Sequence, residues 1–220
     1  MRPDLRRTVE AHTRWARPPL VSEVELRLIT PECPLWVGTE EDAEQAGLPS
    51  PFWAFAWPGG QALARFVLDR PEWVRGKHVL DVGSGSAVEA IAALQAGAAS
   101  VTAVDTDPAA AVAAALNAAR NDVPLQTSTE DLIGRTVDAD VVLLGDMTYD
   151  REMAVRVDAW ARTLNAVVLV ADPRRGFLSP QSWRRLHTLD APADVDHAGL
   201  HLVATDIVTP MRSPDAPPRG

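Results

Sequence analysis

Strand-like and helix-like runs alternate along the chain from residue 57 onward, and this alternation limits the possible folds. Short runs rich in Val, Ile and Leu predict strands at residues 78–82, 100–105, 140–145 and 166–171. Helix signals separate them: Gly97 ends one helical run, and Asp107-Pro108 forms an N-cap and first helical position. Because such alternation is typical of parallel sheets, we predict an α/β fold with a doubly wound, mostly parallel sheet.

The segments on either side of this core are less regular. Residues 1–50 predict a small N-terminal extension, with a helix capped by Asp4 and a β-leaning stretch at 24–30. Ser179-Pro180 predicts the start of a late helix carrying Trp183 and Leu186, and a further strand is expected near 200–208. We expect residues 51–208 to form the main domain and the proline-rich tail 209–220 to be disordered.

Composition narrows the function classes. The 220-residue chain has a formal net charge of −9, which argues against a general binder of nucleic acid or anionic membranes. The charge is compatible with a cationic protein target, but solubility alone explains it equally well. Cys33 is the only cysteine, so no internal disulfide can form and a reducing compartment is expected. No apolar run is long enough to cross a bilayer, and His197 and His201 lack an acidic partner for a metal site. We expect a cytoplasmic, metal-free monomer.

A glycine-bearing turn follows the strand predicted at 78–82. It reads Val-Leu-Asp-Val-Gly-Ser-Gly-Ser-Ala over residues 79–87, and glycines at Gly83 and Gly85 would let a ligand approach the main chain closely. A dinucleotide fingerprint would place its third small residue at Val88, whereas here it is Ala87. Asp81 would repel a pyrophosphate but suits a cationic amino group, and Asp105 ends the next strand where it could accept ribose hydroxyls.

This turn resembles the D-x-G-x-G-x-G motif of class I, seven-β-strand S-adenosylmethionine-dependent methyltransferases, which have a Rossmann-like fold. Flanking segments over about residues 50–180 look like those of the electron-transfer-flavoprotein beta-subunit lysine methyltransferase family. They read Trp-Pro-Gly-Gly from residue 57, Asp-Thr-Asp-Pro from 105, Glu-Asp-Leu from 130, and Asp-Met-Thr-Tyr-Asp from 146. The resemblance implies S-adenosylmethionine as cofactor, bound by Trp57, Gly59, Asp81, Gly83, Gly85, Asp105 (ribose) and Asp131 (adenine). Ala87 departs from the motif glycine, and we expect its methyl group to crowd the methionine end of the cofactor.

The resemblance also implies that Asp146, Tyr149 and Asp150 act on the substrate amine, in a family motif whose usual aromatic is replaced by Thr148. A free lysine amine has a pKa of about 10.4 and is mostly protonated at neutral pH. An acidic site therefore captures and orients the ammonium, and partial desolvation then favours the neutral, nucleophilic form. Asp150 also stands where the following helix needs an N-cap, so a cap alone and a cap with substrate contact are equally supported.

Three functions from different classes remain open at this stage. The first is methylation of a protein lysine, with the electron transfer flavoprotein beta subunit or a similar folded protein as partner. The second is a small-molecule N-methyltransferase acting on a nicotinamide-like substrate, which would need a closed pocket. The third is a catalytically silent cofactor-binding module. The chain argues against this reading because it retains the motif residues Asp81, Gly83, Gly85, Asp105, Asp146 and Tyr149. The glycine spacing disfavours a dehydrogenase.

Overall fold

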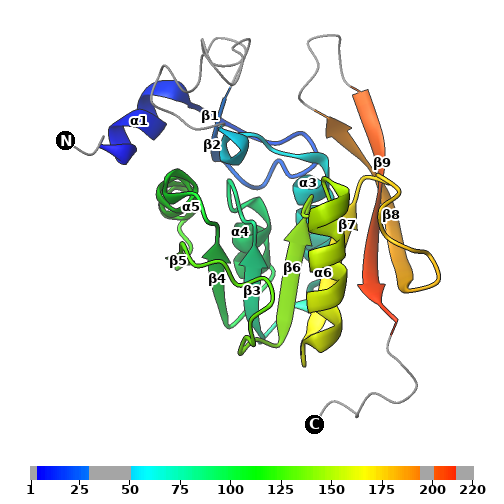
Figure 1. The fold of residues 1–220 in the computed structure, drawn as a ribbon. Helices are drawn as coiled ribbons and strands as arrows, with labels where there is room; N and C mark the ends of the chain where they lie inside the picture. The colour runs from blue at the N-terminus through cyan, green and yellow to red at the C-terminus, as the bar shows by residue number, and fades with distance from the viewer. Residues whose placement is uncertain (1–3, 30–50, 194–200, 212–220) are drawn as a thin grey trace.

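The protein is described by a computed structural model that places residues 4–29, 51–193 and 201–211. Seven strands form one sheet in the order β5-β4-β3-β6-β7-β9-β8 (Figure 1). The first five pair in parallel, and β9 runs antiparallel to both of its neighbours. The predicted doubly wound, mostly parallel seven-stranded sheet is therefore confirmed. The strands are β3 (His78–Val82), β4 (Ser100–Val104), β5 (Gln126–Ser128), β6 (Val141–Gly145), β7 (Val167–Asp172), β8 (Trp183–Ala193) and β9 (His201–Pro210).

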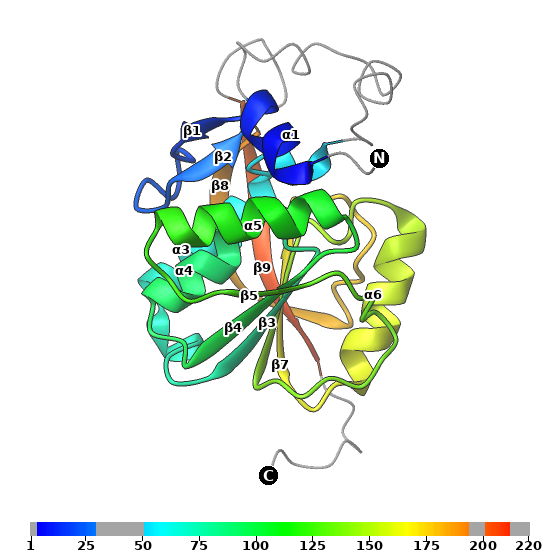
Figure 2. The same cartoon turned by 90° about the vertical axis from the view of Figure 1, so that its left-hand side faces the viewer.

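Helices cover both faces of this sheet, and successive strand residues pack against opposite layers. In β6, Val141 and Leu143 belong to the core cluster that contains α3 and α4, whereas Val142 and Leu144 belong to the cluster that contains α6. Figure 2 shows these layers, with α3 and α4 on the left of the sheet and α6 on the right. The helices are α3 (Pro58–Asp69), α4 (Val88–Gln95), α5 (Pro108–Arg120) and α6 (Arg151–Thr163), with short 3-10 turns η2 (Phe52–Ala54) and η3 (Pro71–Trp73).

The N-terminal extension packs on α5. It consists of α1 (Leu5–His12) and the antiparallel pair β1 (Arg14–Ala16) and β2 (Leu26–Leu28). Asp4 caps α1 as predicted, because its carboxylate accepts a hydrogen bond from the Arg7 amide. Asn117 of α5 and its C-cap residue Asn121 hold the extension. Asn117 Oδ1 accepts from the Arg27 amide at 2.7 Å, and Asn121 Oδ1 accepts from the Glu25 amide at 2.9 Å.

Two expectations for the C-terminal part were wrong. The helix predicted after Ser179 is instead a turn that leads into β8. Trp183 and Leu186 have helical spacing, yet they pack on opposite faces of the sheet, Trp183 with α6 and Leu186 with the α3 and α4 side. Thr209 and Pro210, expected to belong to a disordered tail, are instead part of β9, and residues 212–220 lie outside the described part of the chain. No helix within the described ranges is long and apolar enough to span a membrane.

Candidate active site

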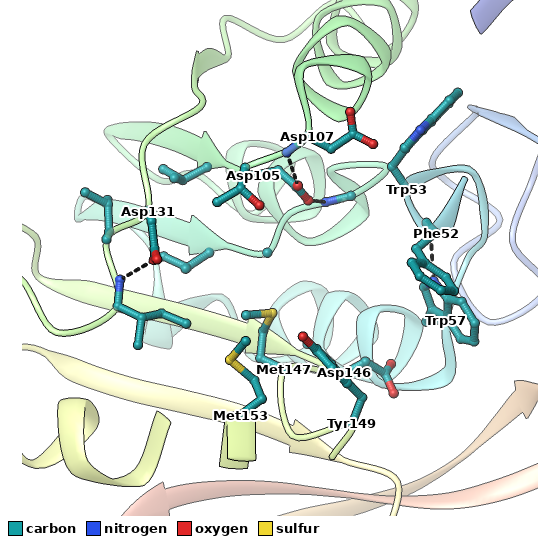
Figure 3. Close-up of a pocket in the computed structure, with 18 of the residues that line it drawn as sticks. Phe52, Trp53, Trp57, Asp105, Asp107, Asp131, Asp146, Met147, Tyr149 and Met153 are labelled. Atoms are coloured by element: carbon teal, nitrogen blue, oxygen red, sulfur yellow. Dashed lines mark hydrogen bonds between the residues drawn. The ribbon is translucent and has the colours of Figure 1, made fainter. Parts of the chain in front are cut away.

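A cavity of about 630 Å³ opens at the carboxyl ends of the parallel strands. Residues at or just beyond the ends of β3, β4 and β6 line it, among them Val82, Val104 and Gly145. Ligands of doubly wound folds bind at this edge of the sheet, and the volume falls in the range of small-molecule sites. Figure 3 shows the cavity with Asp105 and Asp131 on one side, Phe52 and Trp57 on another, and Asp146 and Tyr149 below.

The glycine turn after β3 forms one wall. Gly83 and Gly85 have φ angles of +72° and +48°, a backbone conformation that glycine adopts without the strain of a side chain. A Cβ atom at Gly83 would overlap the side chain of Met147. The Asp105 carboxylate braces the turn, because it accepts a hydrogen bond from the Gly85 amide at 2.9 Å. The turn thus presents bare backbone to the cavity beside a fixed carboxylate.

Ala87, the departure from the motif glycine, does not lie in the cavity wall. Its φ of +62° is the left-handed conformation that a glycine would adopt more easily, and its methyl group is fully buried in the core on the α3 and α4 side. The expectation that this methyl group crowds the cofactor was therefore wrong. The residue stands at the N-cap position of α4 and does not line the cavity.

Apolar side chains and one carboxylate form the end of the cavity beyond Asp105. Leu132, Ile133 and Met153 line this end together with Asp131. Asp131 Oδ1 accepts a hydrogen bond from the Ile133 amide at 3.1 Å, and its Oδ2 lies 3.3 Å from a guanidinium nitrogen of Arg156. A flat aromatic base would fit between such apolar walls, with Asp131 available at its edge.

Asp146 occupies the opposite end, directly after β6. Its φ of +54° turns the side chain toward the N-terminus of α3, where the Gly59 and Gly60 amides donate to Oδ2. Its Oδ1 accepts a hydrogen bond from Arg175 at 2.9 Å. Burial raises the pKa of the Asp146 carboxyl group, whereas Arg175 and the two amides act in the opposite direction.

Aromatic side chains surround the mouth of the cavity near Asp146. Tyr149 is 50% exposed and Phe52 is 59% exposed, while Trp57 is partly buried between Phe52 and Phe55. Burial of the phenol and the nearby Asp150 raise the pKa of Tyr149, so its hydroxyl remains a proton donor at neutral pH. The mouth therefore offers exposed rings to a chain that enters from solvent.

The structure brings together most of the predicted site residues. Those that line the cavity are Trp57, Gly83, Gly85, Asp105, Asp131, Asp146 and Tyr149. Gly59, Asp81 and Asp150 do not line it. Gly59 acts through its amide on Asp146, and Asp150 caps α6 by accepting from the Met153 amide at 2.7 Å. For these three residues a direct contact with cofactor or substrate stays a prediction.

Asp81 lies behind the glycine turn rather than in the cavity wall. Its carboxylate is fully buried, accepts a hydrogen bond from the Ala90 amide at 3.1 Å, and is also hydrogen-bonded to the carboxyl group of Glu89. Burial and the nearby Asp105 raise the pKa of Asp81 to about 6, whereas its hydrogen bonds with Glu89 and the Ala90 amide act in the opposite direction. Burial and repulsion by Asp81 raise the pKa of Glu89 well above its usual range. The two acids therefore share a proton at neutral pH.

Sequence reasoning missed several residues of the site. Arg175 is one of them, and the usable signal was its position just after a strand that ends at this edge of the sheet. Met147 and Met153 line the cavity but look like ordinary core residues in the sequence. Glu89 stood inside an apolar helical run, and a charged residue there was a usable signal of a buried polar contact.

The cavity fits S-adenosylmethionine by the chemistry of its walls. The bare backbone at Gly83 and Gly85 leaves room that a side chain would fill, and Asp105 stands beside it as an acceptor for hydroxyl groups. The other end combines aromatic rings with the Asp146 carboxylate, which suits a cationic sulfonium and ammonium. In the described ranges no group of three or more His, Cys, Asp or Glu side chains could hold a metal ion.

Comparisons of the sequence and of the structure with known proteins both find methyltransferases. The ribosomal protein L11 methyltransferase (PrmA) family matches residues 63–144. The electron transfer flavoprotein beta subunit lysine methyltransferase of Xenopus laevis is 44% identical over 174 residues, which cover 76% of this chain and 70% of that protein. The protein of the same name from Danio rerio is 43% identical over 177 residues, covering 77% and 67%. A candidate RNA methyltransferase from Pyrococcus horikoshii shares the fold, with a TM-score of 0.53 at 19% identity over 72% of this chain and 83% of that one.

Proposed function

Because the chain belongs to the electron transfer flavoprotein beta subunit lysine methyltransferase family, an S-adenosylmethionine-dependent family, we propose that it methylates lysine on a folded protein. The electron transfer flavoprotein beta subunit is the substrate we propose, since the relatives carry that substrate in their names. S-adenosylmethionine would supply a methyl group on an electrophilic sulfonium. The residues of this chain would bind it, orient the amine and shield both from water.

The observation that carries this proposal is the arrangement of the cavity. Asp105 and Asp131 lie at one end, where a ribose and an adenine would be held, and Asp146 and Tyr149 lie at the other. A sulfonium between these ends would face an amine that approaches along Tyr149. Correct alignment of the two reacting groups supplies a large part of the rate of such a displacement.

The exposed mouth favours a protein lysine over a small metabolite. A metabolite enzyme would enclose its substrate, whereas Tyr149 and Phe52 are about half exposed and line the cavity at once. A lysine side chain has a long apolar stem, which can lie against such rings while its amine reaches Asp146. The open mouth of the cavity therefore suits a side chain that projects from a larger surface.

Methyl transfer from radiolabelled S-adenosylmethionine to the purified electron transfer flavoprotein beta subunit tests the proposal. We expect label in that protein, on lysine by mass spectrometry, and none in nicotinamide supplied in the same assay. Asp105→Asn should weaken cofactor binding about tenfold or more, since a charged acceptor for hydroxyl groups is lost. Tyr149→Phe should lower the rate of transfer while leaving the cofactor affinity within about twofold.

Two results would count against it. Label that enters only nicotinamide or another small molecule would support the metabolite enzyme. An absence of measurable S-adenosylmethionine binding by calorimetry would support the silent module. Asp122→Asn is the control, because Asp122 is exposed in the turn after α5 and does not line the cavity.

A further inference from the structure

We propose that Arg175 is a positioning residue that offsets the charge of Asp146 and so favours the neutral, nucleophilic form of the target lysine. This inference rests on the proposed function, because it concerns the amine that would enter beside Asp146 and Tyr149. Arg175 lines the same cavity as those two residues, although it comes from a different strand end. Its role is electrostatic and does not require contact with the methyl group.

The position of Arg175 is fixed by the loop that follows β7. The Arg175 amide donates a hydrogen bond to Asp172 Oδ1 at 3.2 Å, and the Thr148 hydroxyl donates to the same oxygen at 3.4 Å. Asp172 thereby ties the loop after β7 to the loop after β6, which carries both Asp146 and Tyr149. From this anchor the guanidinium reaches Asp146 Oδ1 at 2.9 Å, with its side chain only one-third exposed.

The carboxylate of Asp146 is consequently engaged on both oxygens. Oδ2 accepts from the amides of Gly59 and Gly60, and Oδ1 accepts from Arg175. An amine entering the site meets an ion pair with little net charge rather than an isolated anion. Asp146 can still accept a hydrogen bond through its remaining lone pairs, so it can orient the amine.

This pairing resolves a conflict in the chemistry of lysine methylation. A bare carboxylate would stabilise the ammonium, which has no lone pair with which to attack. A guanidinium stays charged at any relevant pH and disfavours a second cation beside it. The ammonium can then release one proton to water, after which the lysine nitrogen forms the N–CH3 bond as the S–CH3 bond breaks, leaving a methylated ammonium and a neutral thioether.

Other charged groups near this ion pair have partners of their own. Glu89 approaches Asp146 from α4 and shares its proton with Asp81. Asp172 is engaged by Thr148 and the Arg175 amide, and Asp206 of β9 is paired with Arg174. Tyr149 would still be neutral at pH 7 to 9, since its pKa lies above its usual value. Arg175 is the cation that acts directly on Asp146.

Arg174 offers a matched control from the neighbouring position. Its guanidinium forms two hydrogen bonds of 3.1 Å to Asp206, and it does not line the cavity. Arg174→Gln and Arg175→Gln therefore remove the same charge from the same loop, one outside the site and one inside it. Arg175→Lys keeps the charge but loses the planar geometry of the guanidinium.

The experiment is a pH profile of methyl transfer to the purified electron transfer flavoprotein beta subunit between pH 6.5 and 9.5. We expect Arg175→Gln to lower kcat about tenfold at pH 7.5 and to move the rising limb of the kcat profile upward by about one pH unit, because kcat reports the ionisation of the bound amine and one pKa unit changes its neutral fraction tenfold. The difference in rate between Arg175→Gln and wild type should be smaller at pH 9.5. Arg175→Lys should restore most of the rate, and Arg174→Gln should follow the wild-type profile.

If Arg175→Gln loses the same fraction of its rate at every pH, and the rising limb of its profile does not move, the inference is overturned. Arg175 would then have only a structural role. The same holds if Arg175→Lys fails to restore the rate while its thermal unfolding matches the wild type. Cofactor affinity by calorimetry should stay within about twofold in every variant. If the wild-type protein transfers no label to any protein, the proposed function itself fails, which is a distinct result from an unshifted profile.

Discussion

At the scale of single residues, Glu89 and Asp81 are two acids buried beneath the cavity. Asp81 is fully buried and Glu89 is almost so, and the two carboxyl groups are hydrogen-bonded to each other. A buried acid with a raised pKa binds its proton more tightly in the folded protein than in the unfolded chain. Raising the pH from about 4.5 toward the folded pKa of Glu89 therefore lowers the free energy of unfolding, by up to about 1.4 kcal/mol per pH unit.

Glu89→Gln should remove this pH dependence. The amide keeps the shape and can still donate a hydrogen bond to Asp81, but it has no proton to lose. We expect the variant to match the wild type near pH 5 and to be more stable by about 1–3 kcal/mol at pH 8, measured by urea unfolding. Glu152→Gln, on the exposed side of α6, is the control. If the free energies of unfolding of Glu89→Gln and wild type changed in parallel with pH, the proton shared by Asp81 and Glu89 would be contradicted.

The sequence predicted the residues of the site better than their contacts. Asp105 and Asp146 could be placed because each follows a strand, and strand ends in a parallel sheet meet at one edge. Their partners could not be placed, since the bond from Arg175 to Asp146 joins residues 29 positions apart in the chain. Likewise Asp81 was expected in the cavity because of its motif, and only packing shows that α4 covers it.

At the scale of secondary-structure elements, the N-terminus of α3 fits closely against the loop after β6. A Cβ atom at Gly59 would overlap the Asp146 carboxylate and lie 2.7 Å from its amide nitrogen. At Gly60, one residue further, the nearest contact would be Val88 Cγ1 at 3.3 Å. A side chain at position 59 would therefore clash with Asp146, whereas one at position 60 would only crowd Val88.

Gly59→Ala should thus displace Asp146 and Gly60→Ala should not. We expect Gly59→Ala to lower kcat/KM about a hundredfold and to lower the free energy of unfolding by about 2 kcal/mol. Gly60→Ala should stay within about 1 kcal/mol of wild type, because crowding of Val88 offsets the better helix propensity of alanine. Methyl-transfer rates and thermal unfolding of the pair provide the measurement. Similar behaviour of the two variants would rule out the close fit described for Gly59.

Asp150, at the start of α6, has two candidate roles, as the helix cap and as a substrate contact. Its carboxylate caps the helix, and it does not line the cavity. Asp150→Ala should cost about 1 kcal/mol of stability, whereas Asp150→Ser should retain both the cap and near wild-type methyl transfer. Chemical unfolding and initial rates of the two variants test this. A serine variant that is stable but inactive would give Asp150 a direct role in catalysis.

Helix ends with strong local signals were predictable, and β8 was not. Asp4, Asp107 and Asp150 each cap the helix that the sequence assigned to them. Residues 183–186 had helical spacing, but β8 pairs with β9 along its length and contains a register shift between Arg185 and His187. That strand is stabilised by a partner that comes later in the chain, which local spacing does not report.

At the scale of the whole molecule, Asn117 joins three parts of the structure. It is fully buried, accepts a hydrogen bond from the Arg27 amide of β2, and donates one of 2.9 Å to the Ser86 carbonyl of the glycine turn. The N-terminal extension and the glycine turn therefore meet at one side chain of α5. Asn121 contacts the extension and its own helix but not the turn.

Asn117→Ala should weaken both folding and cofactor binding. It leaves a buried amide and a buried carbonyl without their partner, which we expect to cost about 2–4 kcal/mol of unfolding free energy. S-adenosylmethionine affinity by calorimetry should fall severalfold at a temperature where the variant stays folded. Asn121→Ala should lower the free energy of unfolding but leave the S-adenosylmethionine affinity unchanged. An unchanged affinity in Asn117→Ala would show that the turn holds its shape without α5.

The order of strands also has a consequence for synthesis on the ribosome. β9 lies between β7 and β8, although it follows both in the chain. Until residues 201–210 leave the ribosome, the Val- and Leu-rich β7 has an unpaired edge and β8 has no partner strand. Open edges of this kind recruit strands from other chains. A nascent chain truncated before β9 would therefore be a target for aggregation and for chaperones, even though most of the cavity is already encoded.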